Sequence, residues 1–166
     1  MKTTQIFIIT VAISLNSLFA QDNKESEFPT LEGPYMGQKP PGMVAEPFAP
    51  GIISREDWEL EAVFAPGMIE FYFTIDRGAY TSYDPDNFHP TTVGFRQENN
   101  LWKKFIEFRR RGEITFSPDG NRMHMAKGYN DREGDGWSEL IILDPMINRE
   151  DWGIIRLSIC QGHLCV

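Results

Sequence analysis

The chain has 166 residues, a length that fits one domain, and its apolar fraction of 41% and charged fraction of 24% are ordinary for a globular protein. The formal net charge of -8 argues against binding to nucleic acid or to an anionic membrane surface, because both are themselves negative. The strongest basic run spans Lys103, Lys104 and 109–111, and we interpret it as a solvated strand edge rather than a polyanion site.

Residues 1–20 have the pattern of a secretory signal peptide. Lys2 supplies the positive start, and the apolar run from Ile6 to Leu18 is too short to span a bilayer comfortably. Ala20 is the expected cleavage point. We therefore expect the mature chain to be extracytoplasmic, either periplasmic or secreted, without membrane insertion once the signal is removed.

Residues 21–50 are expected to form an extended N-terminal segment. The stretch is polar at first and becomes rich in Pro and Gly from Phe28 onward, which favours extended backbone over helix.

The first predicted hairpin has its turn at Pro66 and Gly67. An apolar strand ends at Phe64, and a second apolar strand runs over 69–74. Proline sets φ near the value that the first corner of a turn needs, and glycine accepts positive φ without a Cβ clash.

Strands are also expected over 91–97 and, after a turn containing two asparagines, over 101–108. The second of these is ambiguous, because Leu101, Phe105 and Phe108 also fit one face of a helix. Repetition elsewhere in the chain favours the strand, and tertiary pairing overrides propensity over so few residues.

The second predicted hairpin has the fuller turn. A short strand ends at Phe116, the turn follows, and alternation resumes over 122–125. Asp119 is able to bond its own backbone two residues on, and Gly120 is expected at positive φ. The turn residues in this hairpin are Ser117, Pro118, Asp119 and Gly120.

An acidic turn over 129–136 is expected to lead into an outer strand over 137–143. Asp131, Glu133 and Asp135 match the first half of a calcium loop, but the twelfth position is Ile142 instead of a bidentate Glu. We therefore interpret the stretch as an acidic hairpin turn.

The chain repeats itself. Phe64 and Phe116 lie about 50 residues apart, and the hexapeptide 53–58 matches 147–152 about 94 positions on. Tryptophans mark equivalent places, two at the ends of the hexapeptides and two after polar turns. They are Trp58, Trp152, Trp102 and Trp137. A third hairpin is expected to begin near Ile154.

The turn at 116–120, the Met-x-Met strand after it and the run 134–139 resemble the TolB-type, WD40-like β-propeller repeat, and 35–42 with 48–51 resembles the opening segment of secreted propeller proteins. The resemblance covers roughly residues 33–159. It implies an all-β fold in which 51–166 forms a partial propeller, with about two four-stranded antiparallel blades and the start of a third. It also implies that 44–53 closes a ring as an outer strand.

The resemblance has two departures. The first hairpin lacks the Asp of the turn, and a complete propeller of this type has about six blades. We therefore expect the N-terminal portion of a longer propeller or a truncated relative of one. The apolar faces around Phe71, Phe73 and Ile154 would then have no partners, and the chain would tend to self-associate.

The sequence contains no recognisable catalytic constellation, so no catalytic, cofactor-binding or metal-binding residue is assigned and no cofactor is expected. We interpret Asp84, Asp86 and His89 as part of a polar loop, and His124 as a solvent-facing strand histidine rather than a channel-lining residue. Two cysteines and one histidine do not complete a zinc site, although the cysteines could pair across a tight loop. These residues are Cys160, Cys165 and His163.

Three function classes stay open. The first, which we favour, is a non-catalytic binding or protein-interaction module for an unknown protein or carbohydrate ligand. The second is the N-terminal part of an enzyme on a propeller scaffold, such as a polysaccharide lyase, a glycosidase or a peptidase-associated domain. The third is a non-functional fragment.

Overall fold

The computed structural model describes residues 31–55, 58–76, 90–149, 151, 153–160 and 163–165. Within these residues the protein is all-β, and the one helical element is the short 3-10 turn η1 (Pro34–Gly37). The strands are β1 (Trp58–Phe64), β2 (Glu70–Asp76), β3 (Thr91–Glu98), β4 (Leu101–Arg109), β5 (Thr115–Phe116), β6 (Arg122–Met125), β7 (Gly128–Glu133), β8 (Gly136–Trp137), β9 (Ile141–Ile142), β10 (Ser158–Cys160) and β11 (His163–Cys165).

The first sheet is an antiparallel meander in the order β1-β2-β3-β4. Strand β2 is buried along its whole length, with Phe71 and Phe73 on one face and Tyr72 and Thr74 on the other. The ambiguous stretch 101–108 lies in β4, so the strand prediction is confirmed. Antiparallel pairing with β3 along β4 stabilises this stretch as a strand, although its local pattern also fits a helix.

The predicted asparagine turn joins β3 to β4. Asn99 and Asn100 have φ of 50° and 70°, the left-handed region that short polar side chains tolerate.

The second sheet has five strands, with β5, β6, β7 and β8 in sequence and β9 also paired with β7. The single outer strand predicted over 137–143 is wrong, because it is broken into β8 and β9 and its register on β7 shifts by one residue between them. The side chains of Asn130 and Ser138 bond backbone groups at the break, which replaces part of the strand ladder.

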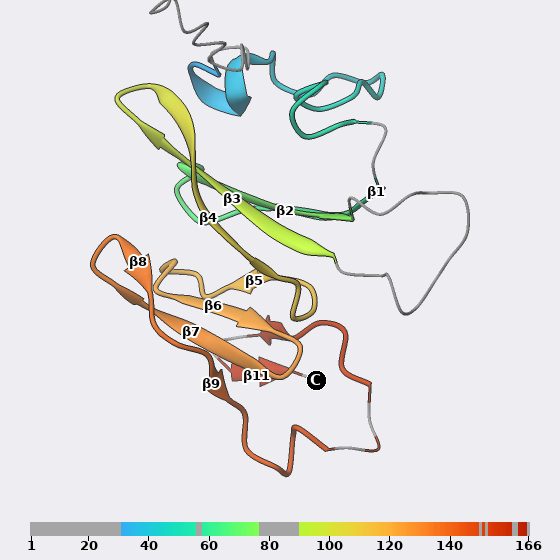
Figure 1. The fold of residues 1–166 in the computed structure, drawn as a ribbon, viewed down its shortest axis with the longest axis vertical. Coiled ribbons are helices and arrows are strands. Elements are labelled where there is room, and N and C mark those ends of the chain that lie inside the picture. The colour runs from blue at the N-terminus through green and yellow to red at the C-terminus, as the bar shows by residue number, and fades with distance from the viewer. Residues whose placement is uncertain are drawn as a thin grey trace, which may run out of the picture.

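The two sheets pack face to face, with the first sheet above the second in Figure 1. Tyr72 from β2 and Met123 and Met125 from β6 form the centre of the layer between them. Partly buried aromatic and aliphatic residues surround that centre: Val63, Phe105, Ile106, Phe108, Phe116, Trp137 and Leu140. The layer makes the two sheets one packed body.

The N-terminal segment covers the other face of the first sheet, at the top of Figure 1. Met36, Ile52 and Ile53 are buried there against Phe71 and Phe73. The expected outer strand over 44–53 is therefore wrong, since this stretch has only turns and bends. The expectation that Phe71 and Phe73 lack partners is wrong for the same reason.

Hydrogen bonds hold the N-terminal segment in place. The indole Nε1 of Trp102 donates to the Gly33 carbonyl at 2.7 Å, and the Trp102 amide donates to the Leu31 carbonyl at 2.8 Å. Gln38 closes the loop, because its side chain donates to the Pro47 carbonyl and accepts from the Ala49 amide. Trp102, the repeat tryptophan of β4, thus anchors the N-terminal segment that covers the first sheet.

A C-terminal hairpin of β10 and β11 follows the second sheet, and β10 lies against β5. It begins at Ser158, four residues later than the Ile154 start that the repeat predicts.

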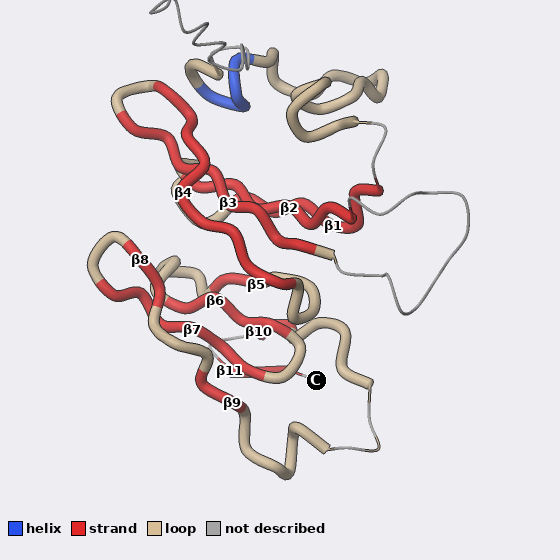
Figure 2. Tube along the Cα trace, viewed as in Figure 1, coloured by secondary structure: helices blue, strands red, loops and turns tan. Residues whose placement is uncertain are grey.

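In each sheet, the turn after the first strand and the turn after the third strand lie at the same end. These are the β1–β2 and β3–β4 turns of the first sheet and the β5–β6 and β7–β8 turns of the second. The turns β3–β4 and β7–β8 lie together at one side in Figure 2, and the Pro66 ring lies next to Gly120 in the β5–β6 turn. We call this end the turn end. Several predicted or compared stretches lie outside the described residues: the signal peptide 1–20, residues 21–30 of the N-terminal segment, the loop residues Asp84, Asp86 and His89, and residues 56, 57, 150 and 152 of the two hexapeptides.

The β5–β6 turn supplies a stability prediction. Gly120 has φ of 72°, and an added Cβ would meet nothing closer than Pro66 at 3.7 Å, so the penalty is conformational rather than steric. We expect Gly120→Val to lower the free energy of unfolding by about 1–2 kcal/mol in urea titrations.

Gly136 is the matched control, because it lies in β8 and is absent from the positive-φ glycines. Gly136→Val should leave the urea midpoint close to that of the parent chain. Equal midpoints for Gly120→Val and the parent would contradict the account.

Candidate functional site at the turn end of the two sheets

A cleft of about 320 Å³ opens at the turn end, between the hairpin turns of the two sheets. Its walls come from the β1–β2, β5–β6 and β7–β8 turns, and its floor comes from β2, β3 and β7. The lining residues are Ala65, Pro66, Ile69, Glu70, Arg96, Asp119, Gly120, Asn121, Arg132, Gly134 and Asp135.

The floor of the cleft is built around the Glu70 carboxylate, whose side chain is 5% exposed. Arg96, its cross-strand neighbour on β3, donates from Nε at 2.8 Å. Arg132, from β7 of the other sheet, donates from both terminal nitrogens at 2.9 and 3.0 Å. The Tyr72 hydroxyl donates at 2.8 Å. Two arginines and a phenol therefore satisfy a carboxylate that burial would otherwise penalise.

The floor also ties the two sheets and the turns together. Trp137 of β8 donates from its indole nitrogen to the Tyr72 hydroxyl at 2.9 Å, and the Arg132 guanidinium lies 3.9 Å from the centre of the Trp137 ring. Arg96 lies over the Phe105 ring and donates to the Asp135 carbonyl at 2.5 Å. We call Glu70, Tyr72, Arg96, Arg132 and Trp137 the Glu70 network.

The Glu70 network sets the protonation states of its members. Burial raises the pKa of Glu70, but hydrogen bonds from Arg132 and Tyr72 and the charges of both arginines outweigh burial, so the net pKa is below its usual value. Burial, with the neighbouring Glu70 carboxylate, raises the pKa of Tyr72 far above its usual value. The floor at neutral pH therefore carries an ionised carboxylate and a neutral phenol.

The rim of the cleft carries the predicted turn residues. The Ser117 hydroxyl donates to Asp119 at 2.5 Å, and the Asn121 amide and side chain donate to the same carboxylate. These bonds lower the pKa of Asp119 to about 2, the Ser117 bond most of all. Asp119 thus fixes the turn as an ionised carboxylate that accepts hydrogen bonds from Ser117 and Asn121.

A second carboxylate, Glu61 of β1, occupies the opposite end of the layer between the sheets. Its oxygens accept from the Thr74 hydroxyl at 2.8 Å and the Ile114 amide at 3.3 Å, and Arg110 Nε lies 3.8 Å away. Burial raises the pKa of Glu61, and the Thr74 bond and the Arg110 charge only partly offset burial. The burial of the Glu61 charge is therefore less well compensated by hydrogen bonds and positive charge than the burial of the Glu70 charge.

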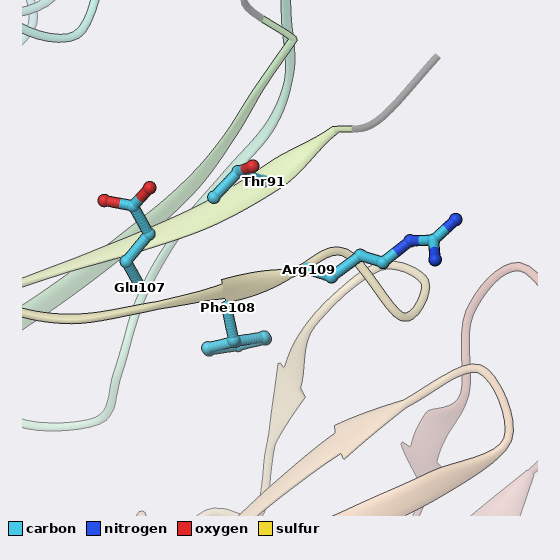
Figure 3. A pocket seen from close by; sticks show the side chains of 4 residues that line it. All are labelled: Thr91, Glu107, Phe108 and Arg109. Atoms are coloured by element: carbon cyan, nitrogen blue, oxygen red, sulfur yellow. The ribbon is translucent and has the colours of Figure 1, made fainter. Parts of the chain in front are cut away.

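A second hollow, of about 490 Å³, is lined by Thr91, Glu107, Phe108 and Arg109. Figure 3 shows that these side chains diverge: Phe108 points away from Glu107, and Arg109 extends past the end of the strand. Polar groups do not converge on one point there, so we place the candidate site at the turn end.

The structure brings three of the predicted turn residues to the cleft. Pro66, Asp119 and Gly120 line it, and Ser117 supports its rim. Gly67 adopts the expected positive φ in the adjacent β1–β2 turn, and Phe64 and Phe116 pack in the layers on either side of the first sheet. Pro118 follows Ser117 in the same turn.

The repeat tryptophans do not gather in one place. Trp137 belongs to the Glu70 network, and Trp102 anchors the N-terminal segment. Trp58 is the first residue of β1, at the end of that strand far from the β1–β2 turn.

His124 corrects one interpretation. It faces away from Met123 and Met125 as expected, but its exposed fraction is 8%, so it is buried rather than solvent-facing. Its Nδ1 has no hydrogen-bond partner among the described residues. Burial lowers the pKa of His124, and the Arg122 charge lowers it further.

Sequence reasoning missed Glu70, Arg96 and Arg132, the residues that form the floor. A signal was present, because Glu70 is a single charge within the apolar run 69–73 and Arg96 follows Gly94 and Phe95 in a strand. A charge at a buried strand position indicates a partner, although it does not say which one.

No three His, Cys, Asp or Glu side chains in the described part of the chain lie close enough to hold a metal ion. The described residues also include no helix long and apolar enough to cross a membrane. The chain matches no protein-family model, no curated protein and no solved structure.

The two buried carboxylates predict opposite pH effects. The lowered pKa of Glu70 means that its contribution to stability is complete above the ordinary value of 4.5 and is lost as pH falls through the folded-state pKa. The raised pKa of Glu61 means that the folded chain prefers the neutral acid, so stability falls as pH rises from 4.5 through the folded-state pKa.

We therefore expect Glu70→Gln to lower the free energy of unfolding by about 3 kcal/mol at pH 7, with a smaller loss at pH 4. Glu61→Gln should leave stability at pH 7 unchanged or raise it. Urea unfolding of both variants and the parent chain between pH 4 and pH 7 measures the difference. Equal losses for the two variants at pH 7 would contradict the different compensation of the two carboxylates.

Proposed function

We propose that this protein is a non-catalytic binding module of the β-propeller repeat type, and that the cleft at the turn end is its ligand site. The observation that carries the proposal is the cleft itself. Short turns from two sheets meet over a floor whose charges are already paired, and the rim leaves polar and apolar side chains open.

Two features of the fold support a propeller-type repeat. Each sheet is a meander of strands that follow one another in the chain, and successive sheets pack face against face. Blades of a propeller have the same organisation. The similarity of the β1–β2 and β5–β6 hairpins adds to this support, because both turns place a glycine at positive φ.

The chemistry of the cleft favours binding over catalysis. Glu70, Arg96 and Arg132 satisfy one another, and Asp119 is fixed by Ser117 and Asn121. None of these groups is placed as a free general base. The rim offers the exposed side chain of Ile69 beside carboxylate and amide groups, a combination that suits a peptide or a carbohydrate.

The proposed setting is the periplasm or the extracellular space, on the basis of the signal-like pattern over 1–20. The net charge of -8 makes nucleic acid an unsuitable ligand.

A binding screen tests the proposal. The secreted chain is applied to peptide and glycan arrays, and hits are measured by calorimetry. We expect Ile69→Ser and Asp135→Ala, two rim changes that spare the side chains of the Glu70 network, to weaken binding at least about tenfold, equivalent to 1.4 kcal/mol.

Val44→Ser and Glu139→Ala are the controls, since both residues are exposed and neither lines the cleft. They should bind as the parent chain does. A ligand that binds the rim variants and the parent equally would place the binding site elsewhere, and turnover of an array component would show that the protein is an enzyme.

A further inference from the structure

The positive charges on the floor of the cleft are already engaged by this chain. Arg96 donates to the Glu70 carboxylate and to the Asp135 carbonyl. Arg132 donates to both oxygens of Glu70 and, at 3.4 Å, to the Gly120 carbonyl. The two arginine side chains are only 14% and 23% exposed. An anionic ligand would have to displace these bonds, so the cleft is not built for one.

The rim of the cleft carries the open charge, and that charge is negative. The Asp135 carboxylate is exposed and forms no hydrogen bond or ion pair within the part of the chain that the structure describes. Space beside it is free, because a Cβ built on Gly134 would meet no atom within 4 Å. Asp119 is exposed as well, and its Oδ2 accepts only from the Asn121 side chain, at 3.1 Å. Since a carboxylate oxygen accepts two hydrogen bonds, both acids are able to bind a further donor.

The surroundings of the cleft have the same sign. Glu98 and Glu133 are exposed at the last positions of β3 and β7, where these strands enter their turns. Glu98 is paired with Lys103 at 3.5 Å, and both side chains are at least half exposed. The turn end therefore attracts cations, in keeping with the net charge of -8.

An aliphatic surface adjoins the open carboxylates. Ile69 is 53% exposed and Pro66 is exposed, and both line the cleft. Met68, between them in the chain, is 44% exposed. A ligand that fills the cleft therefore has an aliphatic part next to a positive group.

The cleft lacks the platform that a sugar ring uses. Sugar rings pack their C–H faces on aromatic side chains, and none of the residues that line this cleft is aromatic. The two aromatic rings next to the floor each have a face covered by an arginine. Arg96 lies 4.0 Å from the centre of Phe105, and Arg132 lies 3.9 Å from the centre of Trp137. The lining thus favours a peptide over a carbohydrate.

We propose that the ligand of the cleft is a peptide segment that carries a lysine or an arginine next to an aliphatic side chain. The cationic group binds Asp135, with Asp119 on the same rim, and the aliphatic side chain packs on Ile69 and Pro66. Hydrogen bonds between a cationic donor and a carboxylate are about twice as strong as neutral ones, so charge complementarity selects this ligand. The inference rests on the proposed ligand site and narrows the class of ligand.

Paired peptides test the proposal. The secreted chain is applied to an array in which each lysine or arginine peptide has a neutral twin, with acetyl-lysine or citrulline in the same place. We expect hits to carry the charged residue beside an aliphatic one, and to bind at least about tenfold more tightly than their twins in calorimetry at about 0.05 M salt. The difference should shrink at about 0.5 M salt, because screening weakens exposed charges.

Asp135→Asn is the decisive variant. It keeps the shape of the side chain and removes its charge, so it should abolish most of the difference between a charged peptide and its twin. Ile69→Ser should instead weaken both twins by the same factor and leave their ratio unchanged. Glu139→Gln removes an exposed acid that does not line the cleft, and it should change neither value. Near-UV circular dichroism confirms the fold of each variant.

The outcomes separate the ligand class from the ligand site. Twins that bind equally, or a difference that survives Asp135→Asn, would overturn the preference for a cation. A glycan array that includes chitosan oligosaccharides is screened in parallel. A glycan that binds the parent chain and is lost on Ile69→Ser would overturn the peptide ligand and leave the ligand site in place. Ligands that bind every variant as they bind the parent chain, or no binding on either array, would overturn both proposals.

Discussion

The structure depends on one buried carboxylate and the donors that reach it from both sheets. Glu70 interrupts an apolar strand, and an unpaired carboxylate at that depth would be costly. Arg96 from its own sheet and Arg132 from the other sheet compensate it, and Tyr72 links the same carboxylate to Trp137. Because the arginines also reach the turn carbonyls of Gly120 and Asp135, this network fixes the shape of the cleft as well as the relative position of the sheets.

The layer between the sheets is therefore apolar at its centre and polar at both ends. Tyr72, Met123 and Met125 supply non-directional burial, on the order of 1.5–3 kcal/mol for each large side chain removed from water. Such burial favours contact without fixing its register. The hydrogen bonds from Arg132 to Glu70 and from the Ile114 amide to Glu61 are directional, so they define how the two sheets align.

Local chemistry was sufficient to predict much of the fold. Turn residues with a defined backbone preference, such as Gly120 and Asn100, indicated where the hairpins turn. The repeat pattern correctly predicted a strand rather than a helix at β4. The cover provided by 31–53 was not predictable, because it packs through irregular turns that lack a periodic pattern. The floor of the candidate site was missed because Glu70 and Arg132 lie 62 positions apart, and neither residue has a local signal that names the other. The break between β8 and β9 depends on Ser138 bonding backbone and side-chain groups of β7, a detail of register rather than composition.

Native-state hydrogen exchange in low urea tests most directly whether the Glu70 network joins the two sheets into one unit. The amides of β2 and β6 lie in different sheets and border the same buried layer. The account predicts that both groups exchange through one opening with a common free energy, and that Arg132→Gln lowers that free energy for both groups together. Separate openings of β2 and β6 in the parent chain, or an effect of Arg132→Gln confined to the second sheet, would contradict it.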